Sequence, residues 1–178
     1  MEIFGYKSFD SKGINQSGEK LMVGNKYHCD GNIKYNHNGY HFSTRFEDTI
    51  VFSDKVDENG NSNSNLLHDV VIAEVIGSGM IDEVPYGYSN YYGYYDMYAC
   101  SDIEIIRYIP REELIFNALQ LTENRMIRFV SGIKLTEEEI KLFENIYPSV
   151  NMAIDYYQRG KKDTYHNRDK YYKLHFTK

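Results

Sequence analysis

The first half of the chain alternates apolar and polar side chains in the way that is typical of β-strands. Residues 3–9 alternate and include three aromatic side chains, which predicts a first strand. Residues 69–76 form a continuous apolar run rich in β-branched side chains, which predicts a central strand covered on both faces. Residues 97–109 return to an alternating pattern and predict the last strand of the sheet.

Residues 23–52 hold the densest set of local structural signals. Short stretches at 26–29, 33–35 and 40–42 are separated by Asp-Gly and Asn-Gly dipeptides, so we expect three strands joined by tight turns. A short helix with acidic side chains in its first turn is predicted directly after the third strand, because acids stabilise a helix N-terminus.

The pattern changes to helical spacing after residue 109. Pro110 suits a first helical position, Thr136 forms a capping box with Glu139, and Pro148 is expected to end that helix, after which Ser149 caps another. The fold class is therefore α+β, a mostly antiparallel sheet with one embedded short helix, followed by a C-terminal helical appendage. The predicted parts are a β-rich domain at 1–109, helices packed on it at 110–160 and a basic aromatic tail at 161–178.

Length and composition fit one hydrophobic core and a location in the cytosol. A chain of 178 residues is long enough for one domain. The two cysteines, Cys29 and Cys100, are too few for a disulfide scaffold and are expected to be reduced thiols. The N-terminus does not resemble a signal peptide, and no apolar run approaches the ~18 residues of a membrane span.

Charge is unevenly distributed along the chain. Residues 159–178 carry a net +5, which leaves −11 for residues 1–158 out of the overall −6. An acidic body repels nucleic acid and attracts basic proteins, so nucleic acid could be contacted only through the tail. The basic tail residues that could contact phosphate are Lys161, Lys162, Arg168, Lys170 and Lys173.

Six short motifs in one order suggest a relationship. They are Gly5–Phe9, Val23–Tyr27, Gly39–Phe42, the helix with Glu47 and Asp48, Glu74-Val75 followed by Gly77–Gly79, and Ser101–Ile105. Over residues 4 to about 113 the chain resembles an uncharacterised domain family common in phages and prophages. The resemblance implies a mobile-element setting in a host cytosol, and it carries no known activity, catalytic residue or cofactor. The tyrosine-rich insert and the residues after 113 depart from the family pattern.

Histidine and cysteine crowd together at His28, Cys29, His37 and His41, which are residue types that bind zinc. Adjacent residues of a strand point to opposite faces, so His28 and Cys29 cannot both join His41. We therefore predict no metal site, and expect a buried Cys29, a structural His41, and surface positions for His28 and His37.

Glu74 interrupts the apolar residues that follow Asp69, at a place where an unpaired carboxylate is costly to bury. One interpretation pairs it with a Lys, an Arg or a Tyr hydroxyl at a sheet edge. In the other, Glu74 and His41 are the catalytic residues of an NAD-using enzyme similar to ADP-ribosyltransferases, in which a strand-borne Glu orients a ribose hydroxyl. The first strand lacks the Arg or His that those enzymes use on the nucleotide.

Residues 86–98 contain seven tyrosines in thirteen positions. Tyrosine offers a large contact area at low entropic cost. Residues 82–98 contain Asp82, Glu83 and Asp96 and no basic residue that would favour nucleic acid. We expect a protein-binding surface made of Tyr86, Tyr88, Tyr91, Tyr92, Tyr94, Tyr95 and Tyr98.

Taken together, the sequence predicts a phage or prophage accessory protein, without a cofactor, that acts by protein binding. Its partner is expected to be a host or mobile-element protein, for instance one belonging to a host defence system that it inhibits. The NAD-using enzyme and nucleic-acid contact through the tail remain the alternatives.

Overall fold

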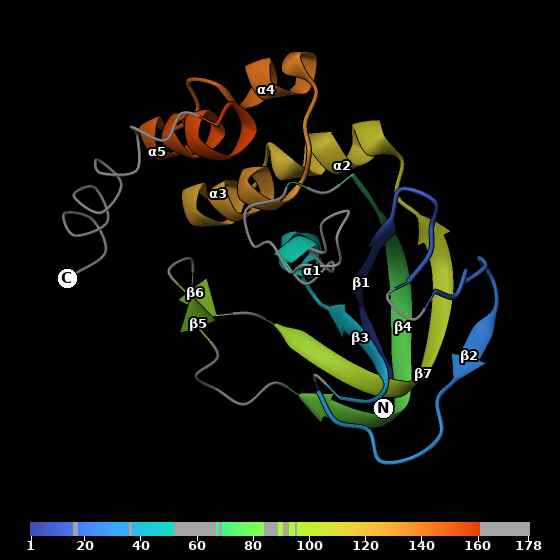
Figure 1. The fold of residues 1–178 in the computed structure, drawn as a ribbon. Coiled ribbons are helices and arrows are strands. Elements are labelled where there is room, and N and C mark those ends of the chain that lie inside the picture. The colour runs from blue at the N-terminus through green and yellow to red at the C-terminus, as the bar shows by residue number, and fades with distance from the viewer. Residues whose placement is uncertain are drawn as a thin grey trace.

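The computed structural model describes residues 1–15, 18–35, 37–51, 67, 69–83, 89–90, 93–94 and 96–160. Its strands are β1 (Ile3–Asp10), β2 (Lys26–His28), β3 (Tyr40–Ser43), β4 (Val70–Glu83), β5 (Ser89–Asn90), β6 (Gly93–Tyr94) and β7 (Met97–Tyr108). Its helices are α1 (Phe46–Val51), α2 (Arg111–Ala118), α3 (Glu123–Gly132), α4 (Glu137–Phe143), α5 (Pro148–Ala153) and the π-helical turn η1 (Ile154–Gln158). The predicted α+β class, with one short helix among the strands, is confirmed (Figure 1).

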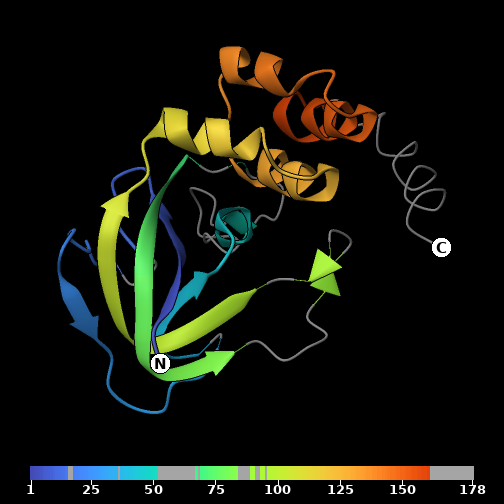
Figure 2. The ribbon, with the colours of Figure 1, turned by 180° about the vertical axis from the view of Figure 1, so that it is seen from behind.

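The main sheet closes on itself into a small antiparallel barrel. Its strand order is β2-β7-β3-β1-β4, and β4 pairs in turn with β7. Strand β7 is long enough to serve three partners: Met97–Cys100 pairs with β3, Asp102–Glu104 pairs with β2, and β4 runs along the opposite edge. The strongly curved β4 and β7 make most of the wall in both views (Figures 1 and 2).

Strand β4 is central, as the continuous apolar run predicts. It pairs with β1 on one edge and with β7 on the other. Ala73 and Val75 face the barrel core, whereas Val70 and Ile72 belong to the core shared with the helices. Both faces of the strand are therefore covered, and this explains why polar residues are rare within it.

The hairpins predicted between residues 26 and 42 are wrong. Strand β2 pairs with β7, so its hydrogen-bonding partner lies more than seventy positions away rather than across the Asp-Gly turn. The stretch 33–35 forms a bridge between Lys34 and Asn38 and buries Ile33 and Tyr35 against the start of β7. A turn signal acts only locally, and here burial of these two side chains outweighs it.

Phe42 fills the barrel interior, and two glycines make room for its ring. A Cβ atom at Gly77 would lie 2.4 Å from the Phe42 ring, and one at Gly5 would lie 2.7 Å from it. Contacts this short are forbidden, so neither position can carry a larger side chain while the ring stays in place. The glycines of β1 and β4 are therefore part of the barrel packing.

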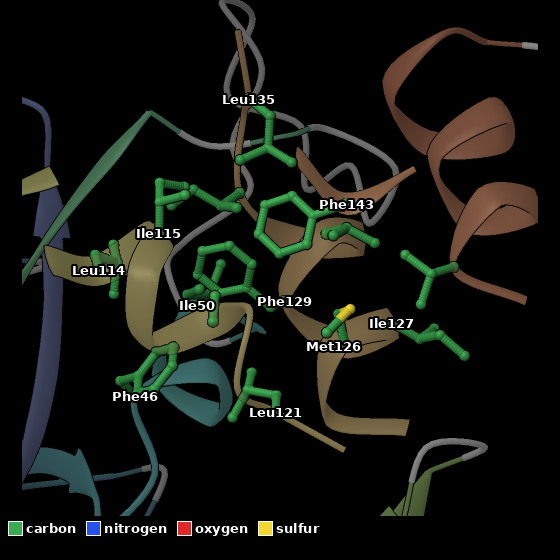
Figure 3. Close-up of a cluster of buried hydrophobic side chains, with 14 of the residues drawn as sticks. Phe46, Ile50, Leu114, Ile115, Leu121, Met126, Ile127, Phe129, Leu135 and Phe143 are labelled. Carbon is green, nitrogen blue, oxygen red and sulfur yellow. The ribbon is translucent and has the colours of Figure 1, made fainter. Parts of the chain in front are cut away.

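The helices form a layer over one end of the barrel and share a core with it. Figure 3 shows Phe129 of α3 between Phe46 of α1 and Phe143 of α4, with ring centroids 5.9 and 5.8 Å apart. The same cluster includes Val70 and Ile72 of the sheet. Sheet and helices therefore stabilise one another through one continuous apolar core.

The helix boundaries follow the sequence signals in part. The capping box is present, because the Glu139 N–H donates to the Thr136 hydroxyl and the Thr136 N–H donates to the Glu139 carboxylate. Pro110 is an N-cap rather than a first helical residue. Pro148 begins α5, with Tyr147 instead of Ser149 as its N-cap, since the first turn of a helix needs no N–H from its proline.

Candidate protein-interaction surface

Strands β5 and β6 form a two-stranded ribbon at the tip of the β4–β7 hairpin, which we call the tyrosine ribbon. Ser89 pairs with Tyr94, and Asn90 pairs with Gly93. The ribbon stands apart from the barrel strands in both views (Figures 1 and 2). Of the predicted surface, the structure describes the backbone of Tyr94 and the whole of Tyr98, whereas Tyr86, Tyr88, Tyr91, Tyr92 and Tyr95 lie outside the described residues.

Tyr98 is half-buried and takes part in the packing of the barrel, and its part in a binding surface stays a prediction. Its ring stacks on Phe42 with the centroids 5.5 Å apart, and it packs against the barrel core. Burial, followed by the nearby Glu83 and Asp96 carboxylates, raises the pKa of the Tyr98 hydroxyl. Tyr98 therefore belongs to the base of the hairpin rather than to its tip.

Two aspartates hold the base of the hairpin to the body. On the β4 side, the Asp82 carboxylate accepts the backbone N–H of Tyr35 at 2.8 Å. On the β7 side, the Asp96 carboxylate accepts the Thr44 hydroxyl at 3.1 Å and lies 3.2 Å from Arg45 Nε. Both acids fall within residues 82–98, whose lack of basic residues argues against nucleic-acid binding.

The Asp96 contacts lead into a buried cluster of charges between α1 and α3. The Asp96 N–H donates to the Asp48 carboxylate at 3.3 Å, and Asp48 in turn accepts a hydrogen bond from Arg128. The neighbouring Glu47 pairs with Arg125, and both acids are fully buried. Burial raises the pKa of Asp48, although Arg128 acts in the opposite direction.

The sequence located these two acids but not their partners. In the sequence, Glu47 and Asp48 are explained by the helix dipole, which favours acids in the first turn of a helix. Nothing in that explanation calls for an arginine partner. Arg125 and Arg128 lie about eighty positions further along the chain. A pattern of apolar and polar positions does not predict contacts between residues so far apart along the chain. These ion pairs are seen only once α3 is packed on α1.

Glu74 is paired with an arginine, as the structural interpretation expects. Its two carboxylate oxygens accept Nε and Nη2 of Arg107, at 2.8 and 2.6 Å, from the neighbouring position on β7. Arg107 also binds both oxygens of Glu113 on α2. These contacts raise the pKa of Arg107, through Glu113 first and Glu74 second. The three residues join the sheet to the first helix.

His41 has different surroundings from Glu74, and strand β1 lies between their strands. Its ring packs edge-on against Tyr35 with the centroids 5.3 Å apart. Burial, and then the positive charge of Lys7, lower the pKa of His41 to about 4. His41 is therefore a neutral, structural histidine at pH 7, and the two residues of the enzyme interpretation have separate contacts.

Within the histidine and cysteine cluster, His28 and Cys29 have different partners. His28 is exposed, with Nδ1 2.7 Å from Asp102, and His37 is exposed as well. Cys29 is half-buried rather than buried, and its thiol lies 3.1 Å from the Asn38 side-chain oxygen. Within the described ranges, no three His, Cys, Asp or Glu side chains gather in a way that could hold a metal ion.

A shallow cavity of about 180 Å³ lies on the outer face of the barrel, over β4, β7 and β2. The residues around it are Glu2, Lys26, Tyr27, His28, Ile76, Ser78, Asp102, Ile103 and Glu104. Cross-strand ion pairs join Lys26 to Glu104 and His28 to Asp102, and the hydrogen bond that His28 donates to the Asp102 carboxylate raises the pKa of His28. Sequence analysis missed these pairs because they depend on the pairing of β2 with β7.

The basic tail residues predicted to contact phosphate lie outside the described residues. In the part of the chain that the structure covers, no helix is long and apolar enough to cross a membrane.

Comparison of the chain with models of protein families, with characterised proteins and with solved structures found no match. The fold is that of a small closed antiparallel barrel with a helical layer and a two-stranded ribbon, β5–β6.

Proposed function

We propose that the chain is an accessory protein of a phage or prophage that binds a protein of its host or of a competing mobile element. It acts in the host cytosol and, through that binding, blocks a host defence system. The genetic setting rests on the six motifs that resemble a phage and prophage domain family. The mode of action rests on the tyrosine ribbon.

The observation that carries the proposal is the position of the tyrosine-rich stretch. Within this stretch the structure describes β5 and β6, which pair with each other and lie along the chain between β4 and β7, the two long strands of the barrel wall. The base of the β4–β7 hairpin is held by Asp82 and Asp96. Tyrosine side chains lose little conformational entropy when they bind, and the tyrosine-rich loops of antibodies use this property in protein recognition.

The charge distribution supports a protein partner. Residues 1–158 carry a net charge of −11, so a basic protein surface is attracted and nucleic acid is repelled. Exposed large apolar side chains such as Phe4 and Phe116, at 51% and 64% exposure, lie on the barrel and on α2. A substitution at one of these exposed aromatic residues, Phe116, therefore serves as a control for substitutions in the tyrosine ribbon.

Affinity capture from host lysate with the full chain tests the proposal. Replacing Tyr91, Tyr92, Tyr94 and Tyr95 with Ser should reduce partner capture at least about tenfold, since each buried interface tyrosine contributes on the order of 1 kcal/mol or more. Tyr98 is left unchanged because it packs on Phe42. Phe116→Ser is the matched control and should leave capture intact. A ribbon variant that retains every partner would contradict the proposal.

A further inference from the structure

Four neighbouring strands of the barrel wall carry a row of outward-facing side chains. Phe4 on β1 lies opposite Ile76 on β4, and Ile76 lies opposite Glu104 on β7. Glu104 in turn lies opposite Lys26 on β2. Side chains that face one another across antiparallel strands point to the same side of a sheet, so the row runs across one face. Figure 1 shows β1, β4, β7 and β2 side by side in this order.

The shallow cavity of about 180 Å³ lies over this row, because Ile76, Glu104 and Lys26 all line it. Ile76 and the buried Ile103 give the cavity an apolar part. Its volume is below the roughly 300–1,000 Å³ that is typical of pockets for drug-sized ligands. The cavity therefore suits a single side chain of a partner better than a whole small molecule.

Phe4 extends the apolar part of the cavity along the row. It is 51% exposed, and its ring packs edge-on against Tyr6 with the centroids 5.7 Å apart. Tyr6 packs in turn on Phe46 of the core, with the centroids 5.9 Å apart. These contacts restrict the Phe4 ring while about half of the residue stays open to solvent. An aromatic side chain that is already restricted loses little entropy when it binds.

The charges around the cavity favour a cation. Three carboxylates line it, those of Glu2, Asp102 and Glu104, against one lysine and one histidine. Lys26 pairs with Glu104, and His28 pairs with Asp102. Glu2 is exposed and has no ion pair within the part of the chain that the structure describes. The excess negative charge adds to the field of a body that carries −11, and both attract positive groups.

We propose that this outer surface, made by Glu2, Phe4, Ile76 and Glu104 and called the Phe4 face, is a docking site for an arginine side chain of a basic protein partner. The guanidinium contacts the Phe4 ring and the Glu2 carboxylate, while the aliphatic stem covers Ile76. Arginine fits better than lysine, because a planar and weakly hydrated guanidinium stacks on an aromatic ring. The inference rests on the proposed function only in that the partner is a protein. Binding of the cation is a property of the free chain.

Titration of the isotope-labelled full chain with acetyl-arginine amide tests the proposal. Amide chemical shifts are followed by NMR, and the changes should saturate and centre on residue 4 and on residues 76–78 and 102–104. Acetyl-citrulline amide has nearly the same shape without the charge. It should bind about threefold more weakly or less, since exposed cation–π contacts and ion pairs contribute a factor of that size.

Two substitutions in the Phe4 face have matched controls on α2. Phe4→Ser and Glu2→Gln should each weaken binding of the arginine probe about threefold. Phe116→Ser and Glu112→Gln change an exposed aromatic residue and an exposed acid elsewhere, and they should leave the affinity unchanged. The amide spectrum shows whether each variant is folded, and Glu2→Gln carries the test by itself if Phe4→Ser unfolds.

Three results overturn the proposal. They are equal binding of the two probes, shift changes centred on another part of the chain, and an affinity that the folded Phe4 and Glu2 variants leave unchanged. Sedimentation equilibrium examines the other possible occupant, a second copy of the chain. A dimer that Phe4→Ser dissociates would assign the face to self-association and also overturn the proposal.

Affinity capture from host lysate separates this inference from the proposed function. Weaker probe binding together with weaker capture by Phe4→Ser supports both proposals. Specific binding of the arginine probe with no protein captured by any form supports the arginine site and rejects the proposed function. Capture that depends on the ribbon tyrosines, in a chain that binds no arginine probe, rejects the Phe4 face alone.

Discussion

At the scale of single residues, Lys7 is a buried lysine whose charged form loses its hydration in the folded protein. It lies on β1, only 9% exposed, and its ammonium donates to the backbone carbonyl of His41 at 2.9 Å. The surrounding side chains include Phe9 and the fully buried Cys100. Burial lowers the pKa of Lys7 to about 8, because the charged form loses its hydration.

This depressed pKa predicts a specific pH dependence of stability. Between about pH 8 and the unfolded value of 10.5, the unfolded chain holds a proton on Lys7 that the folded chain has released, so the contribution of Lys7 to the free energy of unfolding rises with pH in that window. The buried Cys100 thiol, whose pKa is raised to about 12, contributes with the opposite sign above about pH 9 in wild type and variant alike. Lys7→Met should remove the rising contribution and stabilise the protein at pH 7 by about 2–3 kcal/mol. Urea unfolding at a series of pH values measures both effects.

The control for this experiment is Lys26→Met. Lys26 is exposed and its pKa is raised by its hydrogen bond to Glu104, so its removal should not abolish a rise between pH 8 and 10.5. The difference in the free energy of unfolding between wild type and variant is taken at each pH. This difference cancels the titration of tyrosines near pH 10, which is common to both proteins. If the two lysine variants show the same pH profile, burial of Lys7 does not control this titration.

At the scale of elements, the ion-pair triad of Glu74, Arg107 and Glu113 links β4, β7 and α2. Arg107 is the shared member, with both its carboxylate partners in bidentate geometry. Bidentate pairs fix orientation as well as distance, so the triad sets how α2 leaves the sheet after Pro110.

Replacement of Glu74 tests this structural role against the enzyme alternative. Glu74→Gln should lower the midpoint of thermal unfolding by about 2–4 °C, because one bidentate pair is lost from a chain of this size. Glu113→Gln is the matched control and should lower it less, since Glu113 is 37% exposed and Glu74 is 17% exposed.

The NAD-using alternative makes a separate prediction for the same variant. If the chain releases nicotinamide from NAD, Glu74→Gln should abolish that release while the protein stays folded. Wild-type protein that releases none over a long incubation rejects the alternative, whatever the stability result.

At the scale of the whole molecule, charge divides the chain into an acidic body and a basic tail. Residues 1–158 carry −11 and the remainder +5. Long-range attraction of this kind is screened beyond about 10 Å at 0.1 M salt, so it influences encounter more than final affinity.

Removal of residues 161–178 tests contact of the tail with nucleic acid. Any binding of the full chain to a fluorescent single-stranded oligonucleotide should weaken steeply as salt rises and should vanish in the truncated protein, since phosphate contacts release counterions. Equal binding by both forms would show that the contact lies elsewhere. Partner capture by the truncated protein should stay intact if the ribbon is the binding surface.

The sequence by itself determined the elements that depend on neighbouring residues. Apolar alternation located β1 and β7, the β-branched run located β4, and the Thr136 capping box located the start of α4. These signals act over a few residues, where side-chain period and backbone hydrogen bonding decide the outcome. The α+β class follows from their order along the chain.

Only the tertiary structure decided which of those elements pair and which charges meet. Strand β2 pairs with β7 instead of with the next stretch along the chain. Pairing of β4 with β7 closes the barrel, and two buried acids of α1 pair with arginines of α3. Each of these choices depends on the total apolar area and charge buried by a whole arrangement. The apolar area and the charge that become buried depend on segments far apart in the sequence. No local sequence pattern therefore predicts them.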